Sequence, residues 1–162
     1  MRRLAAIVAL VLLAAAPAGA KRDVPGLVVS RDGDLWVGAL QLTSGAAEDT
    51  WPDWSPDRRR IVFSRQEPGE RGASIWVVRR DGGGLRPLTE RGDRVDVMPA
   101  WSFDGSRIAF ARGPLSGGSF DVYSVDARFG GAARVEARGP AEQVAPRWRA
   151  NGTLQVSEIG LD

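Results

Sequence analysis

Carboxylates, serines, arginines and tryptophans are the side chains of this protein that offer chemistry, because its 162 residues include no histidine and no cysteine. Without histidine there is no imidazole base for a serine triad, and without cysteine there is no thiolate nucleophile, iron–sulfur cluster or disulfide. Ser55 and Ser102 therefore lack a histidine to activate them. Two carboxylates suffice for glycoside hydrolysis, but the sequence does not place two of them together. We expect no catalytic residues, no metal site, no cofactor and no enzymatic activity.

Five residues are candidates for a ligand-binding surface: Asp49, Trp51, Asp53, Asp96 and Arg147. The alternative for the aspartates, which we favour, is that they accept backbone N–H bonds in turns. A further acidic group, Asp32-Gly33-Asp34, is not followed by a twelve-residue loop ending in glutamate. We therefore interpret that group as a hairpin turn and not as a calcium site.

An internal repeat of 47 residues determines the elements that carry these side chains. Trp54, Trp101 and Trp148 are 47 residues apart, and a proline precedes each of them by two positions. The same spacing relates further pairs of residues, which are Asp49 with Asp96, Ile61 with Ile108, Phe63 with Phe110, and Trp76 with Tyr123. A repeat of this length is typical of an array of identical supersecondary units.

Each repeat predicts four short antiparallel strands. A first strand carrying the tryptophan ends at a tight turn such as Asp104-Gly105, whose residues tolerate positive φ. An apolar second strand follows, as at 61–63, then a third strand such as 74–78 and a short fourth strand near 85–89. Four strands in about 40 to 50 residues is the pattern of a propeller blade. Trp54, Trp101, Trp148, Trp76 and Tyr123 are then expected to pack between blades as structural core.

The repeated motifs resemble those of TolB-type, WD-like β-propellers. The resemblance rests on the turn Pro-x-Trp-Ser-Pro-Asp at 52–57, on Arg-Ile-Val-Phe at 60–63 and on Arg-Pro-Leu-Thr at 86–89. It implies an all-β fold, and it implies that inner-strand positions line a central channel, with the five candidate binding residues near the channel mouth. It extends over residues 27–157 and includes neither the α/β domain that accompanies the TolB propeller nor a hydrolase domain.

The blade count predicts a partial propeller of about three four-stranded blades. The first copy lacks its tryptophan-bearing strand and the last copy has only two strands, so the two ends of the chain together make up one blade. Closed propellers have four to eight blades. We therefore hypothesise a homodimer that completes a six-bladed ring; the alternative is a truncated remnant of a larger TolB-like protein.

The first twenty residues predict a signal peptide. Met1-Arg2-Arg3 is basic, residues 4–16 are apolar, and residues 17–20 are small or proline, as expected before a cleavage site after Ala20. The apolar run is shorter than the roughly 20 residues of a membrane-spanning helix, so a permanent anchor is the weaker alternative. We assign 21–26 to a linker, 27–158 to the propeller repeats and 159–162 to a tail. The predicted location is extracytoplasmic, either periplasmic or secreted.

Charge argues against nucleic acid as a ligand. Lysine and arginine number 22 against 20 acidic residues, and Arg2 and Arg3 leave with the predicted leader, so the mature side chains balance. We predict a non-enzymatic module that binds a protein or an envelope ligand through loops held by rigid blades. The alternative is a propeller that forms a component or gate of a carbohydrate-active or peptide-processing enzyme.

Overall fold

The computed structural model describes residues 26–160, which form four antiparallel sheets in sequence order and no helix. The first sheet contains β1 (Val28–Arg31), β2 (Asp34–Val37) and β3 (Leu40–Gln41). The predicted signal peptide at 1–20 and most of the predicted linker lie outside the described residues. No described segment forms a helix of sufficient length and apolarity to cross a bilayer.

Two complete four-stranded sheets occupy the middle of the molecule. The second sheet consists of β4 (Glu48–Trp54), β5 (Arg60–Gln66), β6 (Ser74–Arg79) and β7 (Arg86–Pro87). The third consists of β8 (Arg94–Trp101), β9 (Arg107–Pro114), β10 (Asp121–Asp126) and β11 (Gly130–Ala137). The fourth sheet pairs β12 (Glu142–Trp148) with β13 (Leu154–Ile159). The predicted partial propeller of four-stranded antiparallel blades is confirmed.

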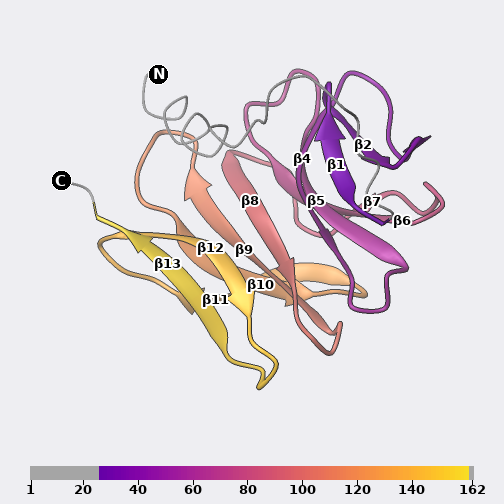
Figure 1. Ribbon diagram of the computed structural model, residues 1–162. Helices are drawn as coiled ribbons and strands as arrows, with labels where there is room; N and C mark the ends of the chain where they lie inside the picture. Colours follow the sequence, from indigo (N-terminus) through magenta and orange to yellow (C-terminus); the bar gives the residue numbers. More distant parts are fainter. Residues whose placement is uncertain (1–25, 161–162) are drawn as a thin grey trace.

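The sheets stand side by side as successive blades, with the first and the last sheet at opposite ends of the array (Figure 1). The blade that the two chain ends were expected to share therefore does not form within one chain. The strand positions are as expected, but β1 and β13 both correspond to the second strand of a blade, so the two chain ends would bring two strands to one place. β13 pairs with β12 as β5 pairs with β4, with Leu154 opposite Trp148 and Ile61 opposite Trp54.

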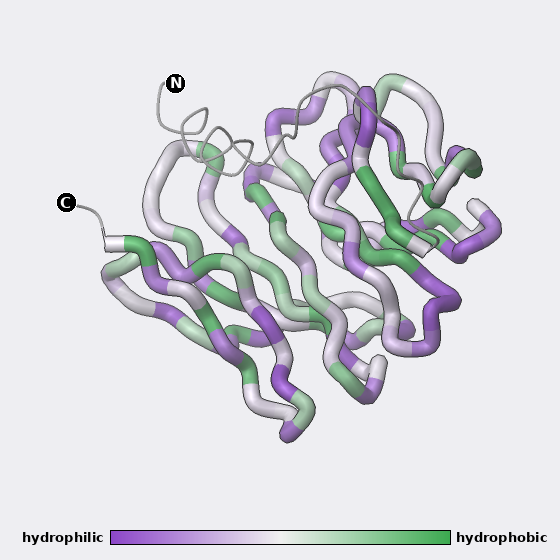
Figure 2. Tube along the Cα trace, in the orientation of Figure 1, coloured by the Kyte–Doolittle hydropathy of each residue, from purple (hydrophilic) through white to green (hydrophobic). Residues whose placement is uncertain are grey.

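The core consists of apolar layers between successive blades. Alternation along β5 directs Val62 to the third sheet, whereas Ile61 and Phe63 pack with Val28 and Leu35 of the first sheet. A smaller cluster joins the third and fourth sheets through Val95, Phe120 and Val144. Hydrophobic residues accordingly run along the strands, and many of the turns are hydrophilic (Figure 2).

Two of the hairpins are closed by a repeated serine–aspartate turn. Ser55 Oγ donates to Asp57 Oδ1 at 2.6 Å and accepts the Arg60 N–H at 2.9 Å. Ser102 makes the equivalent bonds with Asp104 and the Arg107 N–H, at the same two distances. These contacts assign both hydroxyls to turn formation.

Candidate functional site

Each inner strand contains a bulge at the same place in the repeat. The antiparallel register shifts between Thr50 and Asp53 in β4, between Val97 and Ala100 in β8, and between Val144 and Arg147 in β12. A bulge of this kind bends a strand and redirects its side chains, and bulges are frequent beside functional sites. The three inner strands therefore share a local feature that their ladder hydrogen bonds do not require.

The bulges place non-glycine residues in the left-handed backbone region. Trp51, Met98 and Ala145 have φ of 55°, 53° and 49°, and a proline follows each of them. Residues held in this region cost on the order of 1–3 kcal/mol each. The three residues differ in chemistry but keep the same unfavourable conformation, so the bulge shape belongs to the repeat while its side chain varies.

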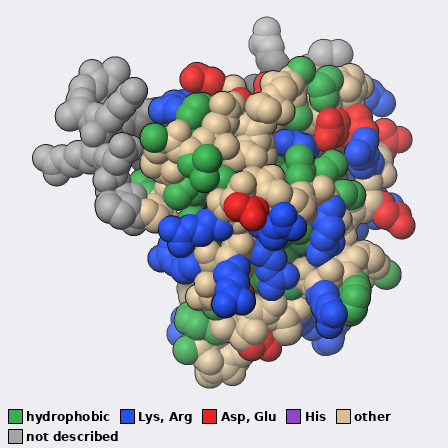
Figure 3. Space-filling model, turned by 90° about the vertical axis from the view of Figure 1, so that its right-hand side faces the viewer, with side chains coloured by type: hydrophobic (Ala, Val, Ile, Leu, Met, Phe, Trp, Pro, Cys, Tyr) green, Lys and Arg blue, Asp and Glu red, His purple; other side chains and the backbone are tan. Residues whose placement is uncertain are grey.

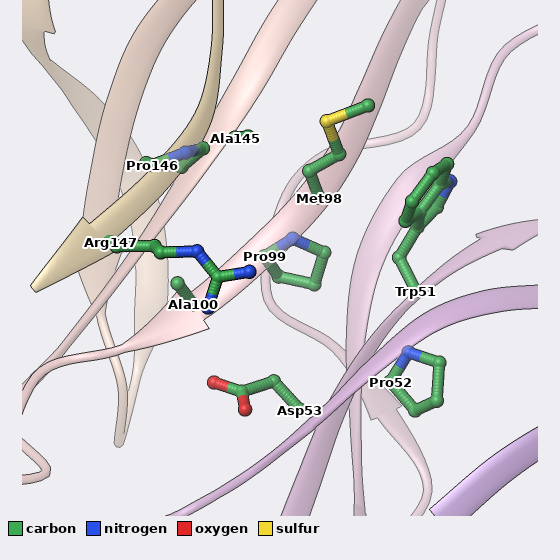
Figure 4. Close-up of a pocket in the computed structure, with 9 residues that line it drawn as sticks. All are labelled: Trp51, Pro52, Asp53, Met98, Pro99, Ala100, Ala145, Pro146 and Arg147. Carbon is green, nitrogen blue, oxygen red and sulfur yellow. The ribbon is translucent and has the colours of Figure 1, made fainter. Parts of the chain in front are cut away.

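One cavity of about 350 Å³ lies where the three bulges meet. Its volume is near the lower end of the range for small-ligand sites. Figure 4 shows Trp51 and Met98 on neighbouring strands with Arg147 reaching toward Asp53. We call this cavity the axial pocket. It is lined by three consecutive residues from each inner strand: Trp51, Pro52, Asp53, Met98, Pro99, Ala100, Ala145, Pro146 and Arg147.

The polar part of this axial pocket is one carboxylate and one guanidinium. Asp53 Oδ2 accepts the Trp101 N–H at 2.9 Å, which joins the second blade to the third. Burial raises the pKa of Asp53, against the lowering effects of backbone N–H groups of Trp101 and Trp54 and of the charge of Arg147. Arg147 is exposed, and among residues 26–160 no carboxylate lies within 4 Å of its guanidinium. The pocket thus contains the Asp53 carboxylate, which a backbone hydrogen bond holds in place, and the exposed Arg147 guanidinium, which has no carboxylate partner among the described residues.

Asp49 and Asp96 lie away from the pocket, in the interior of their blades. Asp49 receives two hydrogen bonds from Arg65, at 2.6 and 2.8 Å, and Asp96 receives two from Arg112, at 2.6 and 2.7 Å. Their exposed fractions are 0% and 1%. Neither carboxylate can meet a ligand at the channel mouth, and their side chains pair with arginine and do not cap turns. Of the five candidates, the structure brings together Trp51, Asp53 and Arg147.

The ion pair itself is part of the repeat, since Arg65 and Arg112 are also 47 residues apart. Burial lowers the pKa of Arg65, but the hydrogen bonds to Asp49 and its negative charge outweigh burial, so that the pKa is raised. In the last blade Gln143 and Glu158 occupy the equivalent places and form a 2.8 Å hydrogen bond. Met98 was not among the predicted site residues, although its place before Pro99 matches that of Trp51 before Pro52.

The five predicted core aromatics lie on blade faces. Trp101 and Trp76 are buried, while Trp54, Trp148 and Tyr123 are half-buried. Trp76 Nε1 donates to Ser74 Oγ at 2.9 Å, and Tyr123 stacks on Phe110 at 6.2 Å between ring centroids. The indole N–H groups of Trp54, Trp101 and Trp148 are buried without a hydrogen-bond partner among the described residues.

The described part of the chain contains no cluster of metal-ligating side chains. No three acidic side chains of residues 26–160 come together in an arrangement suited to a metal ion. The axial pocket contains a single carboxylate, from Asp53. Its lining combines apolar side chains with this carboxylate and the guanidinium of Arg147.

No family model and no curated protein sequence matches this chain. Solved structures do resemble it. A structure assigned as TolB from Agrobacterium tumefaciens is 22% identical with a TM-score of 0.62, over 83% of this chain and 54% of its own. TolB from Acinetobacter baumannii is 18% identical with a TM-score of 0.50, over 81% and 37% of the two chains.

An oligogalacturonate lyase from Vibrio parahaemolyticus is 14% identical with a TM-score of 0.57, over 75% of this chain and 36% of its own. The chain thus spans about half or less of the length of these structures. At such identities the likeness concerns the fold alone, and the fold of the described residues is part of a TolB-like β-propeller.

Proposed function

We propose that this protein is a non-enzymatic binding module of the cell envelope that holds a protein or envelope ligand in the axial pocket. The single observation that carries the proposal is the convergence of three strained bulges on one cavity. Strain of this kind persists where the surrounding structure over-determines it, and it clusters at binding sites. The signal-like residues 1–20 and the TolB-like fold support an extracytoplasmic location.

The pocket favours a ligand that combines an apolar group with an anionic group. Trp51 supplies a rigid aromatic face, and Met98 supplies a flexible thioether that adapts to irregular shapes. Arg147 presents five N–H donors in a fixed fork that matches a carboxylate or a phosphate. An extended peptide with an acidic side chain satisfies both requirements, and so does an anionic envelope saccharide.

Pull-down from an envelope extract tests this proposal with matched variants. Wild-type protein is compared with Trp51→Ala, Arg147→Ala and Phe103→Ala; Phe103 is 61% exposed and lies outside the pocket lining. We expect one ligand species that wild type and Phe103→Ala retain and that both pocket variants lose. Retention of the same species by Trp51→Ala and Arg147→Ala would contradict the assignment of the pocket.

A propeller component of a carbohydrate-active enzyme is the second candidate function. The observations favouring it are the fold shared with an oligogalacturonate lyase and a pocket carboxylate whose pKa is raised. Its test is turnover of glycan and peptide substrates by wild type and Asp53→Asn. Asp49 and Asp96 are unsuited to that test, because their replacement would disturb the core before any chemistry was measured. Turnover by wild type that is lost in Asp53→Asn would support the enzyme component and contradict the non-enzymatic binding module.

A further inference from the structure

Within residues 26–160 the first blade has no inner strand like those of the two middle blades. β1 occupies the place of a second strand, because Ser30 Oγ donates to the Asp49 carbonyl as Ser64 Oγ donates to the Asp96 carbonyl. The third strands agree, since the Leu35 N–H and the Ile75 N–H each donate to a threonine hydroxyl at 2.9 Å. β2 pairs with β1 on one side only, so the other edge of β1 has no strand beside it in the described residues. Such an edge is a template for an added strand.

Side chains on β1 are exposed where their equivalents are buried. Val29 is 38% exposed, whereas Phe63, in the same place of the second blade, is 0% exposed. Arg31 is exposed, whereas Arg65 is 6% exposed. The outer face of the first blade is therefore built like the face that the middle blades bury against a neighbour.

Arg31 keeps half of the repeated arginine site. Its guanidinium lies 4.0 Å from the Trp36 ring centroid, as that of Arg65 lies 5.0 Å from the Trp76 ring. Arg65 and Arg112 each also hold an inner-strand aspartate, but no carboxylate among residues 26–160 lies within 4 Å of Arg31. Figure 3 views this end of the array and shows arginines gathered between apolar side chains. The missing element is thus an extended strand that carries a carboxylate.

We propose that the free edge of β1 binds an extended segment of a partner protein by strand addition. The repeats fix its chemistry and register. In the second blade Asp49 lies opposite Arg65 and Trp54 lies opposite Ile61. In the third blade Asp96 lies opposite Arg112 and Trp101 lies opposite Ile108. The partner segment therefore runs antiparallel to β1, with an acidic residue opposite Arg31 and a large aromatic residue about five positions later, near Leu27.

The residues printed before β1 do not match the pattern of this segment. Asp23 is the one acidic residue before residue 27, and pairing Asp23 with Arg31 would leave a one-residue turn. Tight hairpins need at least two residues in the turn. The residues that precede β1 by the spacing of the other repeats, 15–20, include no acidic side chain.

A second copy of the chain is also a poor occupant. Its fourth sheet would bring β13 to the place in the blade that β1 already fills. Gln155 corresponds to Val62, so the fourth sheet has a polar side chain at a position where the second blade has an apolar one that packs between blades. These features favour a separate partner over the six-bladed homodimer.

A peptide with the sequence of residues 47–56 tests the proposal, because it contains both the acidic residue and the aromatic residue in the required register. The labelled peptide is titrated with the full chain and followed by fluorescence anisotropy. We expect saturable binding that weakens about tenfold or more for the protein variant Arg31→Asp. Arg59→Asp, the same charge change at an exposed arginine outside β1, is expected to bind as wild type does.

Charge reversal separates a specific pair from general attraction. The peptide with Asp49→Arg is expected to bind wild type weakly and to regain affinity for the Arg31→Asp protein. Equal binding of both peptides by wild type, or no binding at all, would overturn the proposal. Light scattering on the free chain tests the remaining occupant: a dimer that Arg31→Asp dissociates would assign the edge to a second copy and overturn the partner protein. Failure of this experiment leaves the axial pocket untouched, because the pocket lining includes no residue of β1.

Discussion

Asp49 and Asp96 illustrate how a buried ion pair serves a repeat. Each carboxylate is removed from water, so it requires a partner that satisfies its charge and its oxygen lone pairs. Arg65 and Arg112 provide two hydrogen bonds each and also lie over aromatic rings of their own blades. The pair thereby fixes the inner strand to the second strand in one register.

Replacement of Asp49 by asparagine is expected to lower the free energy of unfolding by about 3 kcal/mol, because it leaves Arg65 buried without its main charge partner. Asp81→Asn is the matched control, since Asp81 pairs with Arg79 at 3.2 Å on the exposed surface. Exposed pairs contribute little, so this variant should unfold at nearly the same urea concentration as wild type. Urea denaturation measures both, and equal effects would show that the buried pair has no special contribution.

Asp53 makes the stability of the folded protein depend on pH. Burial raises its folded-state pKa above the ordinary value of 3.8, so the folded protein holds this proton more tightly than the unfolded chain does. The stability from this group is present below pH 3.8 and is lost as the pH rises through the raised pKa. Asparagine does not ionise and avoids that loss.

Asp53→Asn is therefore expected to gain stability relative to wild type as the pH increases from 3 to 7. The measurement is urea denaturation of both proteins across that range, taking the difference in unfolding free energy at each pH. A difference that shrinks toward neutral pH would mean that the Trp101 N–H and Arg147 stabilise the ionised carboxylate more than burial disfavours it.

At the scale of the strands and turns, the β4–β5 hairpin contains a residue that its own geometry disfavours. Arg58 has φ of 57°, whereas the equivalent positions in the other two hairpins are Gly105 and Gly152, with φ of 71° and 80°. A side chain in the left-handed region brings Cβ close to the following carbonyl oxygen. The first turn is thus strained where the other two are relaxed.

Arg58→Gly is expected to stabilise the protein by about 1 kcal/mol, because glycine adopts this conformation without the steric cost. Arg58→Ala serves as the control, since it also removes the side chain but keeps Cβ. Alanine should give no comparable gain. Thermal unfolding of the three proteins checks this expectation, and an equal gain in both variants would attribute the effect to the arginine side chain.

The blades were predictable from the sequence because their tryptophans and prolines repeat with one spacing. The axial pocket was only partly predictable. Trp51, Met98 and Ala145 share a backbone conformation but no side-chain chemistry, so residue type alone did not align them; the proline after each was the available signal. Asp49 and Asp96 were assigned to a possible binding surface because the arginines that bury them lie on another strand, and strand pairing decides which side chains meet.

At the scale of the whole molecule, the array is stabilised by contacts between neighbouring blades. The middle sheets are covered on both faces, and Val62, Phe63, Ile108 and Phe110 are all 0% exposed. The fourth sheet has one neighbour, and four of the six residues of β13 are exposed. In such arrays each unit is stabilised by its own fold and by its interfaces, so units with one interface open more readily.

Hydrogen exchange should therefore follow position in the array. We expect the slowest exchange in β5 and β9, which open only with the global unfolding of the protein, and much faster exchange in β3 and β13. Mass spectrometry of peptic fragments resolves these strands. Addition of the 47–56 peptide should slow exchange in β1 and β2 without changing β13, since the added strand provides the first blade with the pairing that it lacks. Uniform exchange across all four sheets would instead indicate a single cooperative unit. The first blade would then be no less stable than the others, and an added strand would have no local instability to reduce.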